Sequence, residues 1–303
     1  MTRKELKFVH VDAFAEERYG GNPAGVVLGA DNLTDEQIYK IARELNVRET
    51  VFVSGSNSAD YSFRFMSPTG EVDFSGHATI AAFHALIEEG RAEIAQDVTM
   101  FSLETHSGLL QVEIVKNETT GLHEVQITHE EPEFLDTYDS VEYAEALGLH
   151  LVDIMSLYPI QTVNTGLPTL MVPVISLDAL QKVNPNWERI EELSSDADYV
   201  AIQVFTKDAY EVTSDAHARH FAPALGVNED PVSGAAAGCL GSYMIHYGWI
   251  SSINNITSIV IEQGYSLNRP SKVIVEVTGT QNNIKQVKVS GTAVTVLKGT
   301  IFL

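Results

Sequence analysis

The stretch VDFSGHATIAAFHALIEEG, residues 72–90, changes from a short polar step into a long apolar run. The run is rich in Ala, Ile and Phe and stops at Gly90, which predicts an apolar helix over 77–88. His77 falls on the first turn of that helix, after the pair Ser75-Gly76. A histidine there could carry a proton, bind a metal ion or serve only as a polar start of the helix. The choice depends on what else the chain can place opposite it.

The step has a counterpart in the second half of the chain. Residues 230–248, DPVSGAAAGCLGSYMIHYG, again place an Asp and a Ser-Gly pair before an Ala-rich helix, here predicted over 234–248. Ordinary N-capping by Asp and Ser would explain both steps. The alternative is a pseudo-twofold arrangement in which two helix N-termini face one cleft. Their free N–H groups and dipoles would then bind an anion without any lysine.

Composition narrows the class of protein. The chain has 303 residues, 44% of them hydrophobic, which is enough for a large core and favours two domains. It carries 19 basic against 41 acidic residues, a formal net charge of −22. Such a charge disfavours binding to nucleic acids or anionic membrane surfaces. An anionic substrate would need a local positive site, which helix N-termini can supply.

A single cysteine, Cys239, excludes a disulfide framework and a multi-cysteine zinc site within one chain. The N-terminal residues lack the apolar run of a signal peptide, and no stretch approaches the ~20 apolar residues of a membrane span. We therefore expect a cytoplasmic protein.

Strand-like and helix-like segments alternate in two similar halves, which predicts an α+β fold. In the clearest helix, 33–46, Thr34 is the expected N-cap, Gln37 completes a capping box, and the apolar residues share one face. The expected domains are 1–122 and 123–285, with 286–303 forming terminal strands that return to the first domain. Further helices are expected at 140–149 and 186–194. Strands are expected at 7–14, 24–28, 49–54 and 61–67, as three strands within 98–131, as two segments within 156–176, and at 199–206 and 210–221.

Five blocks together resemble the PhzF (phenazine-biosynthesis F-like) family, in family order and with compatible spacing. They are DAFAEERYGGNPAGVVL (12–28), IARELNVRETVFV (41–53), FRFMSPTGEVDFSGHATIAAFHAL (63–86), NTGLPTLMVPV (164–174) and RHFAPALGVNEDPVSGAAAG (219–238). The resemblance implies the diaminopimelate-epimerase-like fold, in which two similar α/β domains related by pseudo-twofold symmetry each wrap a sheet around a central helix. It also implies a homodimer that acts on a small carboxylate without a metal or an organic cofactor.

The family member that gives the name isomerises a cyclic amino acid by moving a proton between carbons. By resemblance, Glu49 is the proton shuttle, His77 and Asp230 assist it and orient the substrate, and the backbone at Gly76 and Gly234 binds the carboxylate. The candidate substrate-binding residues are Asn22, Ser75, Gly76, Ser233, Gly234 and Ala235.

Two departures qualify the resemblance. Some members have Ser where this chain has Ala235, so a hydroxyl is absent from the expected pocket. The cysteine pair of epimerases with this fold would fall near Ser75 and Ser233, and serine cannot deprotonate an α-carbon as a thiolate can. Thiol-based racemisation is therefore disfavoured, and Cys239 is expected to be a packing residue.

The residues themselves suggest compatible chemistry. We expect Glu49 to be partly buried against Val51 and Phe65, where a carboxyl group can accept and return a proton. The positive end of a helix favours a neutral His77, which can donate one hydrogen bond and accept another. Asp230 would orient His77 or a substrate amino group, or cap the helix at 234.

Other residues carry weaker signals. Asn22 is expected to fix a turn that lines the pocket, and Asn164 to line it from the second half. His217 and His220 are three apart on an extended segment and point to opposite faces, so joint metal coordination is not expected. No metal site is predicted.

The leading hypothesis is a cofactor-independent isomerase that moves a proton on a small carboxylate or amino-acid-like substrate. An epimerase or racemase would need two bases, and only Glu49 is a strong candidate. A catalytically silent protein that binds small acids is the alternative outside enzymes. A serine hydrolase is the weakest option, because no nucleophile elbow is present.

Overall fold

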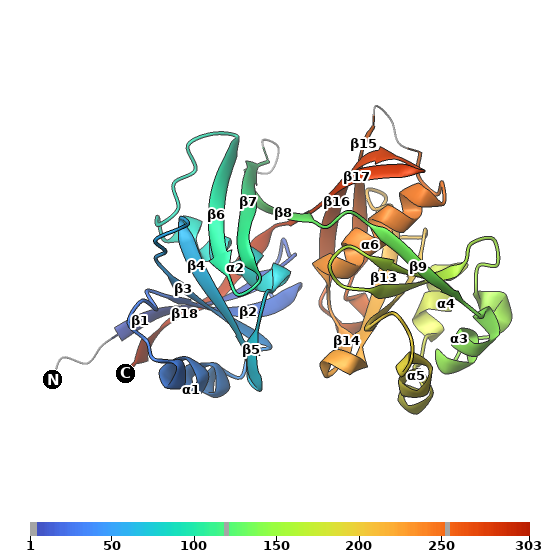
Figure 1. Ribbon diagram of the computed structural model, residues 1–303, viewed down its shortest axis with the longest axis horizontal. Helices are drawn as coiled ribbons and strands as arrows, with labels where there is room; N and C mark the ends of the chain where they lie inside the picture. Colours follow the sequence, from blue (N-terminus) through green and yellow to red (C-terminus); the bar gives the residue numbers. More distant parts are fainter. Residues whose placement is uncertain (1–4, 118–120, 252–254) are drawn as a thin grey trace. The chain divides into compact units, whose positions relative to one another are not determined.

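The computed structural model describes residues 5–117, 121–251 and 255–303 (Figure 1). The chain divides into two compact units. Unit 1 comprises Met1–Ile127 and Ser290–Leu303, and unit 2 comprises Thr128–Val289. The chain thus passes from unit 1 to unit 2 after Ile127 and returns after Val289, where the sequence suggested 122 and 285.

Unit 1 is a sheet wrapped around one buried helix. Its elements are β1 (Glu5–Ala13), β2 (Asn22–Leu28), α1 (Asp35–Leu45), β3 (Glu49–Ser54), β4 (Tyr61–Ser67), β5 (Gly70–Val72), α2 (Gly76–Glu88), β6 (Val98–Thr105), β7 (Gly108–Lys116), most of β8 (His123–His129) and β18 (Ala293–Phe302). The terminal strand β18 pairs antiparallel with β1, and β1 pairs with β2. Two crossovers connect parallel strands, α1 between β2 and β3, and α2 between β4 and β6.

Helix α2 is buried because it is apolar on nearly all sides. Ala78, Ile80 and Phe83 have no exposed surface, and the helix contacts β1, β2, β3 and β18. Helix α1 instead covers the sheet with one apolar face, on which Ile38 and Ala42 pack against Phe8 and other core residues.

Unit 2 repeats this plan. Its elements are β9 (Glu133–Tyr138), α3 (Ser140–Ala146), η1 (Leu151–Asp153), β10 (Ile160–Asn164), β11 (Thr169–Pro173), α4 (Leu177–Lys182), α5 (Trp187–Ser194), β12 (Ala201–Thr206), β13 (Ala216–Ala222), η2 (Pro223–Leu225), β14 (Val227–Asp230), α6 (Gly234–His246), β15 (Ile256–Gln263), η3 (Tyr265–Leu267), β16 (Ser271–Thr280) and most of β17 (Asn283–Gly291). Helix α6 connects the parallel strands β13 and β15, as α2 connects β4 and β6. The predicted fold of two similar α/β halves, each built around a central helix, is confirmed.

The first part of the strand expected over 210–221 is wrong, because β13 begins only at Ala216. Residues 207–215, between β12 and β13, form no strand. The backbone N–H groups of Tyr210 and Glu211 donate to the carboxylate of Glu262 instead of to a neighbouring strand. A side chain distant in sequence has therefore replaced the ladder partners that a strand would need.

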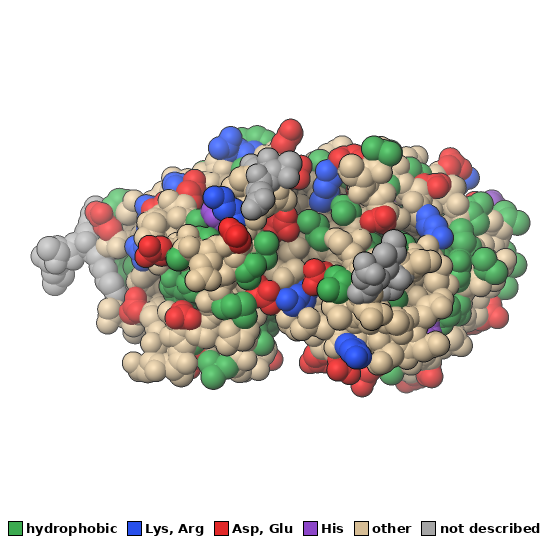
Figure 2. Space-filling view, turned by 90° about the horizontal axis from the view of Figure 1, so that it is seen from above, with side chains coloured by type: hydrophobic (Ala, Val, Ile, Leu, Met, Phe, Trp, Pro, Cys, Tyr) green, Lys and Arg blue, Asp and Glu red, His purple; other side chains and the backbone are tan. Residues whose placement is uncertain are grey.

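Acidic side chains are spread across the face shown in Figure 2, in keeping with the net charge of −22. Within the described residues, none of the helices has both the length and the apolar character to cross a membrane.

Candidate active site

The start of α2 presents open backbone. Ser75 is the N-cap, and its Oγ accepts a hydrogen bond from the N–H of Ala78 at 3.4 Å. Gly76 follows as the first helical residue, and a Cβ built on it would meet no atom within 4 Å. A ligand could therefore approach the free N–H groups of this helix end closely, and the helix dipole would favour an anion.

Glu49 and His77 lie beside each other in unit 1. Glu49 begins β3 and stands opposite Ala24 of β2, while His77 is on the first turn of α2. Glu49 Oε2 lies 3.8 Å from His77 Nδ1, and the two side chains are 17% and 10% exposed. At that separation they form no hydrogen bond, because 3.8 Å is beyond hydrogen-bonding distance. His77 Nδ1 is instead 3.3 Å from Ser75 Oγ.

Two polar atoms of this pair are buried without a partner. Neither Glu49 Oε2 nor His77 Nε2 has a hydrogen bond to any described residue. Leaving a buried polar atom unsatisfied costs about 1–3 kcal/mol. Both atoms are therefore suited to hydrogen bonds from a bound molecule.

Burial sets the charge of His77. Removal from solvent lowers the pKa of His77, while Glu49 opposes the shift and Arg48 adds to it. The imidazole is therefore neutral near pH 7, as expected, but burial is the main cause. A neutral ring can accept a proton at one nitrogen and donate a hydrogen bond from the other, and a carboxylate can also accept a proton, so the pair has groups suited to general acid–base chemistry.

Asn22 is fully buried at the start of β2. It lies two residues before Ala24 and so shares the face of the sheet that carries Glu49. In unit 1 the structure thus brings Glu49, Ser75 and His77 together and places Asn22 on the same face.

The predicted residues of unit 2 surround the start of α6. Ser233 is the N-cap, and its Oγ accepts from the N–H of Ala236 at 3.3 Å. Gly234 and Ala235 are the first two helical residues. Asp230 ends β14, is 7% exposed and stands opposite His220. The N-cap of α6 is Ser233 rather than Asp230.

Sequence reasoning missed two neighbours of these residues. Arg48 lowers the pKa of His77 through its charge, and its position next to Glu49 in NVRET was the available signal. In unit 2, Gln263 Oε1 accepts the N–H of Ser233 at 3.3 Å. No motif marks Gln263, because it comes from β15, far along the chain.

Four further residues that the sequence singled out are accounted for by burial or by contacts with other protein residues. Burial raises the pKa of the Cys239 thiol to about 11, which fits the expected packing role. His217 contacts Glu262 and His220 contacts Gln203, so the two histidines have separate partners, as their spacing predicts. Asn164 accepts from the N–H of Gly166 and donates to Glu133.

A family model described as phenazine biosynthesis-like protein matches residues 11–299. The chain belongs to this family. Among the PhzF relatives, an uncharacterized isomerase of Clostridium acetobutylicum is 35% identical over 305 residues, covering 99% of either chain. The uncharacterized isomerase YfhB of Bacillus subtilis is 35% identical over 293 residues, covering 96% of this chain and 97% of the relative.

Solved structures agree with the PhzF assignment. A PhzF-family protein of Bacillus anthracis matches with a TM-score of 0.90 at 32% identity, covering 99% of this chain and 100% of that one. A hydroxyproline epimerase from Agrobacterium vitis has a TM-score of 0.63 at 12% identity, covering 99% and 93%, and shares the fold alone. These findings place this PhzF protein among the isomerases.

Proposed function

We propose that this chain is a cofactor-independent isomerase that moves a proton on a small carboxylate or amino-acid-like substrate. Glu49 transfers the proton, His77 assists it as a neutral donor and acceptor, and the N–H groups at Ser75-Gly76 bind the carboxylate. The observation that carries the proposal is the pair of buried, unpartnered atoms, Glu49 Oε2 and His77 Nε2, beside an open helix start. For unit 2 we propose that Asp230 orients the substrate and that Ser233, Gly234 and Ala235 bind it.

Hydrogen exchange with solvent tests the proposal directly. The protein would be incubated in D₂O with a panel of small amino and carboxylic acids, and deuterium incorporation at carbon followed by NMR. We expect Glu49→Gln to lower the exchange rate at least ~100-fold, because general base catalysis contributes about that much. Glu44→Gln, at an exposed glutamate of α1, is the matched control and should leave the rate unchanged. An exchange rate in Glu49→Gln equal to that of the wild type would contradict the assignment of Glu49 as the group that transfers the proton.

The same experiment separates the alternatives. Exchange with inversion at the labelled carbon would indicate an epimerase. Tight binding of an acid without deuterium incorporation into it would indicate a catalytically silent binding protein. We further propose that the protein acts as a homodimer, which light scattering would show as twice the mass of one chain.

A further inference from the structure

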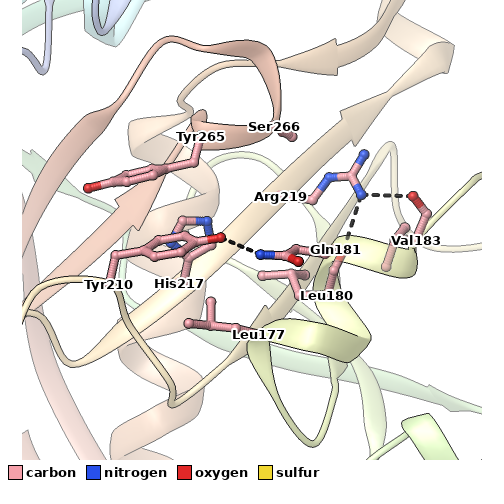
Figure 3. Close-up of a pocket in the computed structure, with 9 residues that line it drawn as sticks. All are labelled: Leu177, Leu180, Gln181, Val183, Tyr210, His217, Arg219, Tyr265 and Ser266. Carbon is pink, nitrogen blue, oxygen red and sulfur yellow. Dashed lines mark hydrogen bonds between the residues drawn. The ribbon is translucent and has the colours of Figure 1, made fainter.

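Unit 2 contains a cavity of about 390 Å³ beside α4 and β13 (Figure 3). Leu177 and Leu180 of α4 form an apolar wall, and Tyr210, His217 and Tyr265 form an aromatic one. Cavities that hold small ligands begin at about 300 Å³. The space is therefore large enough for a molecule with one or two rings.

This cavity is separate from the residues proposed to bind substrate. Successive side chains of a strand point to opposite faces, so His217 and Arg219 share one face of β13 and His220 lies on the other. His220 stands opposite Asp230, whereas His217 and Arg219 line the cavity. The cavity therefore lies on the opposite side of β13 from Asp230.

A buried carboxylate fixes the orientation of His217. Glu262 has no exposed surface and accepts hydrogen bonds from His217 Nδ1 at 2.9 Å and from the N–H groups of Tyr210 and Glu211 at 2.9 and 2.8 Å. Burial raises the pKa of Glu262, but these hydrogen bonds outweigh it and the pKa is lowered. Glu262 is thus ionised at neutral pH, and His217 Nδ1 carries the proton.

The other nitrogen of His217 is available to a ligand. Nε2 has no hydrogen bond to any residue that the structure describes, and the ring lines the cavity. In a neutral imidazole whose Nδ1 is protonated, Nε2 is an acceptor. The cavity therefore offers a hydrogen-bond acceptor to a molecule that carries an N–H or O–H group.

The aromatic wall favours a cation. The rings of Tyr210 and Tyr265 are stacked with centroids 4.7 Å apart, and His217 meets both edge-on at 5.0 and 4.9 Å. Tyrosine faces attract positive charge through their quadrupole. They also offer apolar surface to a flat body.

The charges around the cavity disfavour an anion. Arg219 donates to Glu229 through Nε and Nη2, and to the carbonyls of Leu180 and Val183 through Nη1. Four of its five N–H groups are thus held by the protein, and Glu229 matches its charge. Because Glu262 adds a second negative charge, Arg219, Glu229 and Glu262 together carry no net positive charge.

We propose that this cavity is a second ligand site, for a small protonated organic amine. The ammonium group donates a hydrogen bond to His217 Nε2, and the apolar body packs between the Tyr210–Tyr265 pair and the leucines of α4.

Binding of 2-phenylethylamine to the full-length protein, measured by isothermal titration calorimetry, tests the proposal. Two probes of similar shape, 3-phenylpropanoate and 2-phenylethanol, replace the cation by an anion and by a neutral group. We expect the amine to bind at least ~10-fold more tightly than either, since one charge-assisted hydrogen bond contributes that much. Equal affinity for the alcohol, or tighter binding of the carboxylate, would overturn the proposal.

Variants locate the binding. His217→Asn keeps an N–H donor for Glu262 but removes Nε2, and should weaken amine binding about 10-fold. Leu177→Trp fills the cavity from α4 and should abolish it, so this variant decides the matter if His217→Asn fails to fold. Tyr39→Ala, at a partly exposed tyrosine of α1, is the control. Glu49→Gln should bind the amine normally, which separates this site from the proposed reaction. Unchanged binding by Leu177→Trp would refute the proposal.

Discussion

His77 shows how burial, rather than helix position, sets the protonation of a side chain. The sequence predicted a neutral imidazole from the helix dipole, whereas removal from solvent is the largest influence on its pKa. Glu49, whose Oε2 lies 3.8 Å from Nδ1, favours the charged form but does not prevail. The imidazole of His77 is therefore neutral because the surrounding core removes it from solvent.

A pH dependence of stability follows from this burial. The pKa of His77 is lower in the folded than in the unfolded chain, so below the ordinary value of 6.5 the unfolded state binds more protons. Stability from neutral His77 is thus fully present above pH 6.5 and is lost as the pH falls towards the folded pKa. Between pH 7.5 and pH 5, the free energy of unfolding of His77→Gln should fall by about 1 kcal/mol less than that of the wild type, as measured by urea denaturation. Identical losses in the two proteins would contradict this.

At Gly76 we expect a substitution to weaken substrate binding while leaving the stability of the fold almost unchanged. A methyl group there would meet no protein atom within 4 Å, so Gly76→Ala should change the unfolding free energy by less than about 1 kcal/mol. The same methyl group would occupy space beside the free N–H groups, and substrate affinity should fall about 10-fold or more. Steady-state kinetics and thermal denaturation together check both statements. Gly299→Ala, where a Cβ also has open space, should affect neither.

Sequence could nominate residues but not their partners. Glu49 and His77 were found through motifs, because each lies in a block that resembles a known family. Gln263 was not found, because its contact with Ser233 depends on β15 lying beside β13. Contacts of this kind are set by the pairing of strands far apart in the chain.

Among the elements, α1 is the most fully specified by its own sequence. Thr34 Oγ1 accepts the N–H of Gln37, and Gln37 Oε1 accepts the N–H of Thr34, so the predicted capping box is confirmed. Thr34→Ala should destabilise unit 1 by about 1 kcal/mol in chemical denaturation, because a helix N–H loses its acceptor. Thr34→Ser retains the hydroxyl and should remain near wild type.

The helices were predicted better than the segments between strands. The ends of α2 and α6 follow from Ser caps and Ala-rich runs, which are local signals. Residues 210–215 were predicted as the start of a strand, but the backbone N–H groups of Tyr210 and Glu211 donate to Glu262 instead of to a neighbouring strand. Helix α4 was missed because six residues are too few to show the periodicity of a helix in the sequence.

At the scale of the whole molecule, the two units differ in continuity. Unit 2 is one stretch, Thr128–Val289, whereas unit 1 needs β18 from the end of the chain to pair with β1. Unit 2 also has its own core, which includes Tyr143, Val172 and Phe221. A fragment of residues 128–289 should therefore fold alone, and one of residues 1–127 should not.

Circular dichroism and urea titration of the two fragments check this prediction. We expect a cooperative transition for 128–289, and recovery of one for 1–127 only when residues 290–303 are rejoined to it. Cooperative unfolding of 1–127 by itself would show that β18 is dispensable.

The alternation of side chains on the two faces of β13 limits the insertions and deletions that this strand can accept. Its seven residues serve a different chemistry on each face, with His217 and Arg219 on one side and His220 on the other. A point substitution alters one face at a time. Loss or gain of a single codon within Ala216–Ala222 would exchange the faces for every later residue. Single substitutions can therefore change either face of this strand separately, whereas an insertion or deletion of one residue disturbs both faces at once.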